Sequence, residues 1–76
     1  MNKQHYEFWV LANVFEENCY FHYREGEGKE IICWGDVMTA EHYASEDEAR
    51  EEMVSLLHVY GIEVEPRRVT IDITIE

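Results

Sequence analysis

One helix signal in the second half of the chain constrains the fold more than any other feature. Ser45-Glu46-Asp47-Glu48 has the spacing of a capping box, in which the serine hydroxyl and the Glu48 carboxylate each accept a backbone N–H at the start of a helix. An apolar stripe at helical spacing follows, made of Ala49, Met53, Leu56, Leu57 and Tyr60. Gly61 comes directly after it, where a left-handed C-cap is expected. The sequence therefore predicts one helix over about residues 46–60.

The segments before this helix are typical of β-structure. Residues 6–15 are rich in β-branched and aromatic side chains, which favour strands. Residues 19–24 and 30–34 are expected to form two further strands, joined by a glycine-containing loop at 25–29. A turn at 16–18 should separate the first two strands, because asparagine tolerates the left-handed conformation. Residues 36–43 fit either an irregular turn or a turn leading into a short strand near 41–43.

A last strand is predicted after the helix. Val69, Ile71, Ile73 and Ile75 alternate with polar residues, which is typical of a half-buried antiparallel strand with its apolar face toward the helix. Pro66, which has no N–H to donate, indicates a break or a sheet edge. The order strand, strand, strand, helix, strand predicts an α+β fold, an antiparallel sheet of three to five strands with one helix packed on one face. At 76 residues the chain is expected to be a single domain, 1–76.

Charge is the main functional clue in the composition. The chain has 17 acidic and 6 basic residues, a formal net charge of −11. Its 46% hydrophobic and 13% aromatic content argues against intrinsic disorder. An acidic folded domain repels nucleic acid and anionic membranes, and it attracts basic surfaces such as those that hold DNA or RNA. A partner protein with such a surface is therefore expected, rather than direct contact with nucleic acid or a membrane.

Catalysis and metal binding find little support in the residue pattern. Cys19 and His22 are three residues apart, which points them to opposite faces of a strand, and the remaining histidines and Cys33 show no paired spacing. The acids are too numerous for adjacent pairs to indicate general acid–base chemistry. We expect no enzymatic activity, no metal and no cofactor. Without a long apolar run or a signal peptide, the protein is expected in the cytoplasm with reduced cysteines.

The acidic residues fall into two groups. One lies on and just before the helix and contains Glu41, Glu46, Asp47, Glu48, Glu51 and Glu52. The other lies at the hairpin ends and contains Glu16, Glu17, Glu25, Glu27 and Glu30. In one interpretation these acids cap the helix and keep a small protein soluble. In the other, their carboxylates imitate a row of phosphates and occupy a basic cleft of a nucleic-acid-binding protein.

A second candidate surface is an aromatic sheet face. If the helix covers one face of the sheet, the other face would expose Trp9, Leu11, Tyr20 and His22. Two alternatives remain open: residues 36–43 could cover Trp9 and Leu11, or the assignment of the two strand faces could be inverted.

The stretch from Trp34 to Ala49, WGDVMTAEHYASEDEA, resembles a strand-to-helix pattern in very small phage and prophage proteins. Some anti-CRISPR proteins are similar in size and layout, and several anti-CRISPR and anti-restriction proteins are acidic nucleic-acid mimics. The resemblance implies a phage-encoded inhibitor, but it transfers no functional residue, because these inhibitors share no common site.

The expected function is inhibition of a host defence protein, with a CRISPR effector as the expected target, in the cytoplasm of an infected bacterial cell. The inhibitor, a monomer or homodimer, would block DNA or RNA engagement by mimicry or steric occlusion. The alternative is a non-enzymatic accessory or oligomerisation module that uses the aromatic sheet face. Candidate contact residues are Glu16, Glu17, Glu25, Glu27, Glu41, Glu46, Asp47, Glu51, Glu52, Trp9 and Tyr20.

Overall fold

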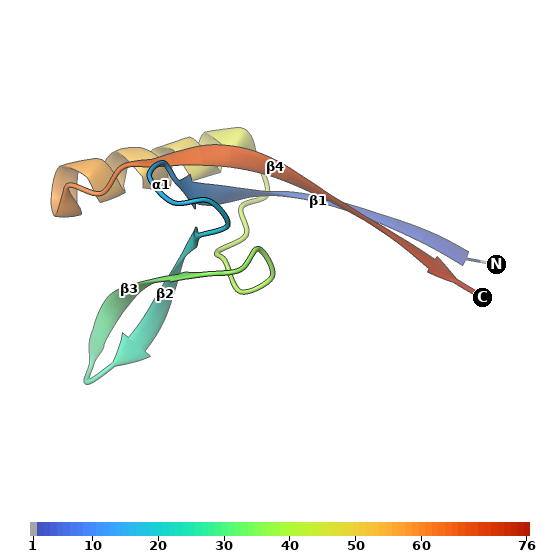
Figure 1. Ribbon diagram of the computed structural model, residues 1–76, viewed down its shortest axis with the longest axis horizontal. Helices are drawn as coiled ribbons and strands as arrows, with labels where there is room; N and C mark the ends of the chain where they lie inside the picture. The colour runs from blue at the N-terminus through green and yellow to red at the C-terminus, as the bar shows by residue number, and fades with distance from the viewer. Residues whose placement is uncertain (1) are drawn as a thin grey trace.

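The computed structural model describes residues 2–76 and contains one antiparallel sheet and one helix (Figure 1). The elements follow the chain as β1 (Asn2–Asn13), β2 (Tyr20–Gly26), β3 (Lys29–Gly35), α1 (Glu46–Tyr60) and β4 (Val64–Ile75). The spatial order of the strands is β3-β2-β1-β4, so the last strand pairs with the first. The predicted α+β fold, its element order and the helix bounds are confirmed.

Both ends of α1 are fixed by the residues that the sequence indicates. Ser45 has an extended φ of −141°, and its hydroxyl accepts the N–H of Glu48 at 3.2 Å. The Glu48 carboxylate accepts the N–H of Ala44 at 3.0 Å, one residue earlier than a capping box requires. At the other end Gly61 has a φ of 67° and donates its N–H to the carbonyl of Leu57 at 3.0 Å. The helix therefore begins and ends through local contacts alone.

β1 and β4 form a long two-stranded ribbon. Their pairing runs without interruption from Asn2↔Ile75 to Asn13↔Val64. β1 thus begins four residues before the predicted position, because β4 supplies backbone partners to a polar segment that has no strand signal of its own. β4 is an edge strand, and an edge is where a sheet tolerates Pro66. The predicted sheet edge at this proline is confirmed.

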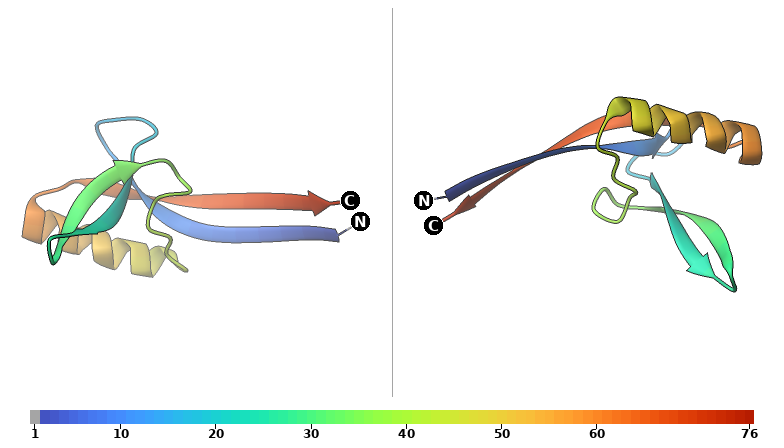
Figure 2. Two further views of the ribbon diagram at one scale, coloured as in Figure 1. Left: turned by 90° about the horizontal axis from the view of Figure 1, so that it is seen from below. Right: turned by 180° about the vertical axis from the view of Figure 1, so that it is seen from behind.

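The β2–β3 hairpin leans away from the ribbon, as Figures 1 and 2 show. Its tight turn places Glu27 and Gly28 at φ values of 53° and 73°, the pattern of a two-residue type I′ hairpin. β2 pairs with β1 only at Ala12↔Tyr20.

Residues 36–43 take the place beside β1 that β2 leaves free. They form a turn over 37–39 and then a single antiparallel bridge, in which Trp9 and Tyr43 exchange backbone hydrogen bonds of 2.8 Å in both directions. Next to this bridge the rings of Phe8 and His42 stack with their centroids 3.9 Å apart. The segment is therefore a turn followed by one bridge, which lies between the two expectations.

The core lies between α1 and the face of the sheet that carries Leu11. Its buried members are Leu11, Phe21, Ala49, Leu56 and Val64, with Trp9 and Tyr23 among the residues packed against them. The prediction that Trp9 and Leu11 share an exposed face with Tyr20 and His22 is wrong. Leu11 is 0% exposed, and Tyr20, which pairs with Ala12, belongs to the opposite face. The faces were inverted because β1 is apolar on both sides over residues 8–14.

Beyond the helix, the ribbon continues as a projection that carries both chain ends at its tip (Figures 1 and 2). We call its outer part, residues 2–8 of β1 and 69–75 of β4, the arm. The remaining strands, the helix and their connections, residues 9–68, are called the body. The apolar face of β4, Val69 to Ile75, was expected to pack on the helix. That prediction is wrong: the whole of this face lies in the arm, and because Val69 pairs with Phe8 it is on the side of the sheet opposite Leu11, with Ile73 and Ile75 exposed.

Candidate functional site

Two of the predicted helix acids are engaged in local contacts. Glu46 forms an ion pair with Arg50 one turn later, with Oε1 2.7 Å from Nη2 and 3.1 Å from Nε. Glu48 holds the N–H of Ala44, as described above. Their carboxylates therefore stabilise the first turns of α1 and are only partly available to a partner.

Glu41 and Glu52 hold the hairpin against the rest of the body. A carboxylate oxygen of Glu41 accepts the backbone N–H of Tyr23 at 3.2 Å, and the Tyr23 hydroxyl donates to the Glu52 carboxylate. Burial is the main cause of a raised pKa at both Tyr23 and Tyr43, and the charge of Glu52 adds to it in each case. Both acids were predicted as contact residues for a partner, and the structure gives each a contact within the fold.

Asp47 and Glu51 are the two predicted helix acids that stay free. They lie one turn apart on α1, both are exposed, and neither has a hydrogen bond or ion pair within residues 2–76. Together with Arg50 and Val54 they line a shallow, open depression. This pair is the part of the helix surface with carboxylates available to a cationic partner.

The hairpin-end acids occupy two separate places. Glu16 and Glu17 lie in the turn before β2, whereas Glu25, Glu27 and Glu30 lie at the β2–β3 tip. Seven strand residues at about 3.3 Å each put these places roughly 20 Å apart. Glu16 also accepts the thiol proton of Cys19 at 3.5 Å, and burial together with this contact raises the pKa of that thiol. The three acids at the tip are exposed.

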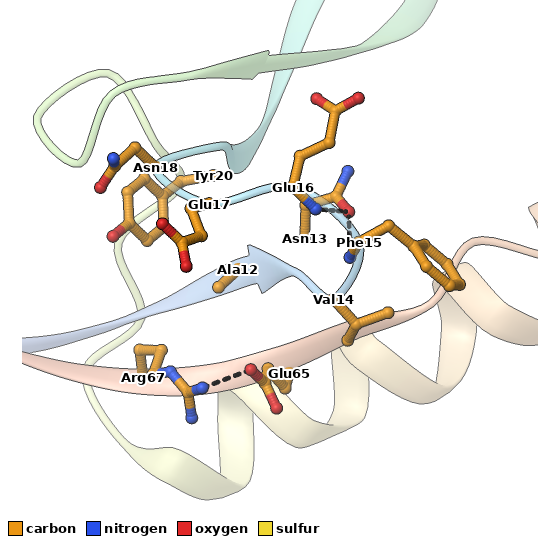
Figure 3. Close-up of a pocket in the computed structure, with 10 residues that line it drawn as sticks. All are labelled: Ala12, Asn13, Val14, Phe15, Glu16, Glu17, Asn18, Tyr20, Glu65 and Arg67. Carbon is orange, nitrogen blue, oxygen red and sulfur yellow. Dashed lines mark hydrogen bonds and ion pairs between the residues drawn. The ribbon is translucent and has the colours of Figure 1, made fainter.

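The turn before β2 and the base of β4 enclose a shallow pocket (Figure 3). Asn13 shapes one wall, because its side-chain oxygen accepts the N–H of Phe15 at 2.8 Å and that of Glu16 at 3.2 Å. Figure 3 shows Tyr20 beside Glu17 and Asn18, with the ion pair between Glu65 and Arg67 across the pocket on β4.

Sequence reasoning did not place Arg67, Glu65 or Phe15 at a site, because the pairing of β4 with β1 joins segments that are distant in the chain. Phe15 is 79% exposed beside the pocket. The single cation of the pocket, Arg67, already pairs with a carboxylate, so the pocket has no free positive group for an anionic ligand.

Across residues 2–76, no cluster of three or more His, Cys, Asp or Glu side chains has a geometry that could hold a metal ion. No helix in this part of the chain is long and apolar enough to cross a membrane. No family model, curated protein or solved structure matches the chain. The charge and shape of the surface are therefore what bears on function.

Proposed function

We propose that this protein is a non-enzymatic inhibitor that binds, through its acidic body, a basic nucleic-acid-binding surface of a host defence protein. The observation that carries the proposal is the distribution of charge. Residues 9–68 contain 14 acidic and 5 basic residues, whereas the arm contains one lysine, one glutamate and one aspartate. The negative field is thus concentrated on the body, the part that a cationic cleft would attract.

The contact is assigned to free carboxylates on α1 and at the hairpin tip. These are Asp47 and Glu51 on α1 and the acids of the hairpin tip, Glu25, Glu27 and Glu30. Bound in a cleft built for phosphates, such groups would replace the nucleic acid as counter-charges and keep it out by occlusion. The resemblance of residues 34–49 to phage inhibitors makes a CRISPR effector in the infected bacterial cell the first partner to test.

The test is binding to purified candidate effectors at increasing salt concentration, with displacement of labelled nucleic acid as a second readout. The association constant should fall steeply as salt rises, because carboxylates in a cationic cleft lose affinity with screening. An affinity that does not change with salt would refute the proposal.

A pair of charge-reversal variants locates the contact. The Asp47→Lys/Glu51→Lys double variant changes two exposed carboxylates that have no hydrogen bond or ion pair within residues 2–76. The control, Glu63→Lys/Glu76→Lys, alters net charge by the same amount at exposed positions outside α1 and the hairpin tip. We expect the first variant to lose far more affinity than the control. Equal losses would mean that overall charge, rather than this surface, determines binding.

A further inference from the structure

The arm is amphipathic, and its apolar face is open. Antiparallel pairing puts directly opposed residues on the same face, so Phe8 and Val69 share a face with Tyr6 and Ile71. The same face continues toward the tip with Ile73 and Ile75, which are 40% and 49% exposed. The ring of His42 stacks on Phe8 at the base of this row, where Phe8, Val69 and Ile71 are half-buried, so the open part of the face is its outer part.

The opposite face of the arm is polar and carries side chains of both charges. It carries Lys3, His5 and Glu7 on β1 against Thr70, Asp72 and Thr74 on β4. His5 Nδ1 lies 2.6 Å from Asp72 Oδ1, and Glu7 Oε1 lies 3.9 Å from Arg68 Nη1 at the base of the arm. This face is suited to water.

A two-stranded ribbon of this kind is only marginally stable in water unless a third layer covers its apolar side. We propose that a second copy of this chain supplies that layer, and that the apolar faces of two arms stack in antiparallel orientation to form a homodimer. This inference is independent of the function proposed for the acidic body.

Two features favour a second copy as the occupant. The apolar face carries no charged residue along the arm: its polar members are Tyr6, whose hydroxyl donates to Gln4 Oε1 at 2.8 Å, Gln4 itself, and Asn2, opposite Ile75 at the exposed tip. An identical face therefore meets no like charge. The chain as a whole, at −11, would be repelled by an anionic membrane.

The charge distribution also selects the antiparallel arrangement. Side-by-side stacking would bring two acidic bodies together, whereas antiparallel stacking separates them by about the length of an arm. The apolar face of the arm contains four cross-strand residue pairs, spaced two residues apart along each strand, and they span roughly 20 Å. This separation is more than twice the electrostatic screening length of about 8 Å at physiological salt. The dimer can therefore form without placing the two negative bodies in contact.

The size of the face determines how strong this dimer can be. About 20 Å of ribbon by about 10 Å across two strands gives a contact well below the ~800 Å² per partner of a standard interface. We therefore expect a reversible dimer with a dissociation constant from micromolar to about 1 mM. Raising the salt concentration should tighten it, because salt screens the repulsion between the bodies. Binding of the body to a basic partner should respond in the opposite sense, so the two proposals can fail separately.

Sedimentation equilibrium over a concentration series up to about 1 mM tests the proposal. The Ile73→Lys/Ile75→Lys variant should weaken the dimer at least roughly tenfold, since each dimer would bury four ammonium groups. The control, Thr70→Lys/Thr74→Lys, adds the same charge to the polar face and should still dimerise. A wild-type protein that stays monomeric over the whole series, or an isoleucine variant that dimerises like the control, would overturn the proposal.

A measurement on the unaltered protein covers the case in which the isoleucine variant does not fold. Backbone amide shifts recorded on dilution should change in residues 2–8 and 69–75 and stay constant in the body. Changes confined to the body would assign self-association to another surface and would equally contradict the proposal.

Discussion

Replacing Leu11 and Ile73 by alanine, one at a time, tests which face of the ribbon is buried. Leu11 is 0% exposed in the core cluster, so its truncation should leave a cavity and cost about 2–5 kcal/mol. Ile73 is 40% exposed, and the three carbons that it would lose contribute about 0.8 kcal/mol each when fully buried. Because only about three-fifths of Ile73 is buried, its replacement by alanine should cost at most roughly 1.5 kcal/mol, and no enclosed cavity adds to this cost.

These costs are large against the whole stability, which is about 4–11 kcal/mol for a 76-residue domain. Urea unfolding followed by far-UV circular dichroism, at a protein concentration where any dimer is dissociated, would measure both. A Leu11→Ala cost below about 1 kcal/mol, or an Ile73→Ala cost equal to it, would refute the assignment of the helix-facing side.

Three further changes probe the helix ends and the buried tyrosines. Ser45→Ala should lower the free energy of unfolding by about 1 kcal/mol, because the Glu48 N–H loses its acceptor, and an unchanged urea midpoint would exclude this cap. Gly61→Ala should cost about 1–2 kcal/mol through its positive φ alone, since no atom lies within 4 Å of the added carbon, and Gly61→Asn should recover most of it. Burial raises the pKa of Tyr23 and Tyr43 above the ordinary tyrosine value of 10.0, so their contribution to stability is complete below that pH and declines above it. Urea midpoints measured from neutral to alkaline pH should fall accordingly, and replacing both tyrosines by phenylalanine should flatten the curve.

The helix could be predicted to the residue because its signals are local. The cap at Ser45, the apolar stripe and the left-handed Gly61 all act within one or two turns of the chain. The faces of β1 could not be predicted in the same way. Phe8 and Val10 make one face apolar and Trp9 and Leu11 the other, so the buried side depends on where α1 and residues 36–43 pack, and both are remote in sequence.

The roles of the acidic residues also differ in whether they depend on local spacing or on contacts between segments that are remote in the sequence. The capping role of Glu48 follows from its spacing to Ser45 and was predicted, whereas the ion pair of Glu46 with Arg50 was not. The contacts of Glu41 and Glu52 with Tyr23 bridge 18 and 29 residues of chain, and no local pattern contains them. Asp47 and Glu51 could be named from the sequence, but only the contacts of their neighbours show that these two carboxylates are free.

The pairing of β1 with β4 has a consequence for folding during synthesis. The outermost pair, Asn2 with Ile75, joins residues 73 positions apart in the chain, so Asn2 leaves the ribosome well before its partner. The β2–β3 hairpin and α1 rest mainly on short-range contacts and can form early, but β1 has no ladder partner along most of its length until β4 has emerged. The apolar part of β1, residues 8–13, pairs with Val64–Val69, so its edge toward β4 stays unpaired until that half of β4 has been made, and during that interval the nascent chain depends on protection from aggregation.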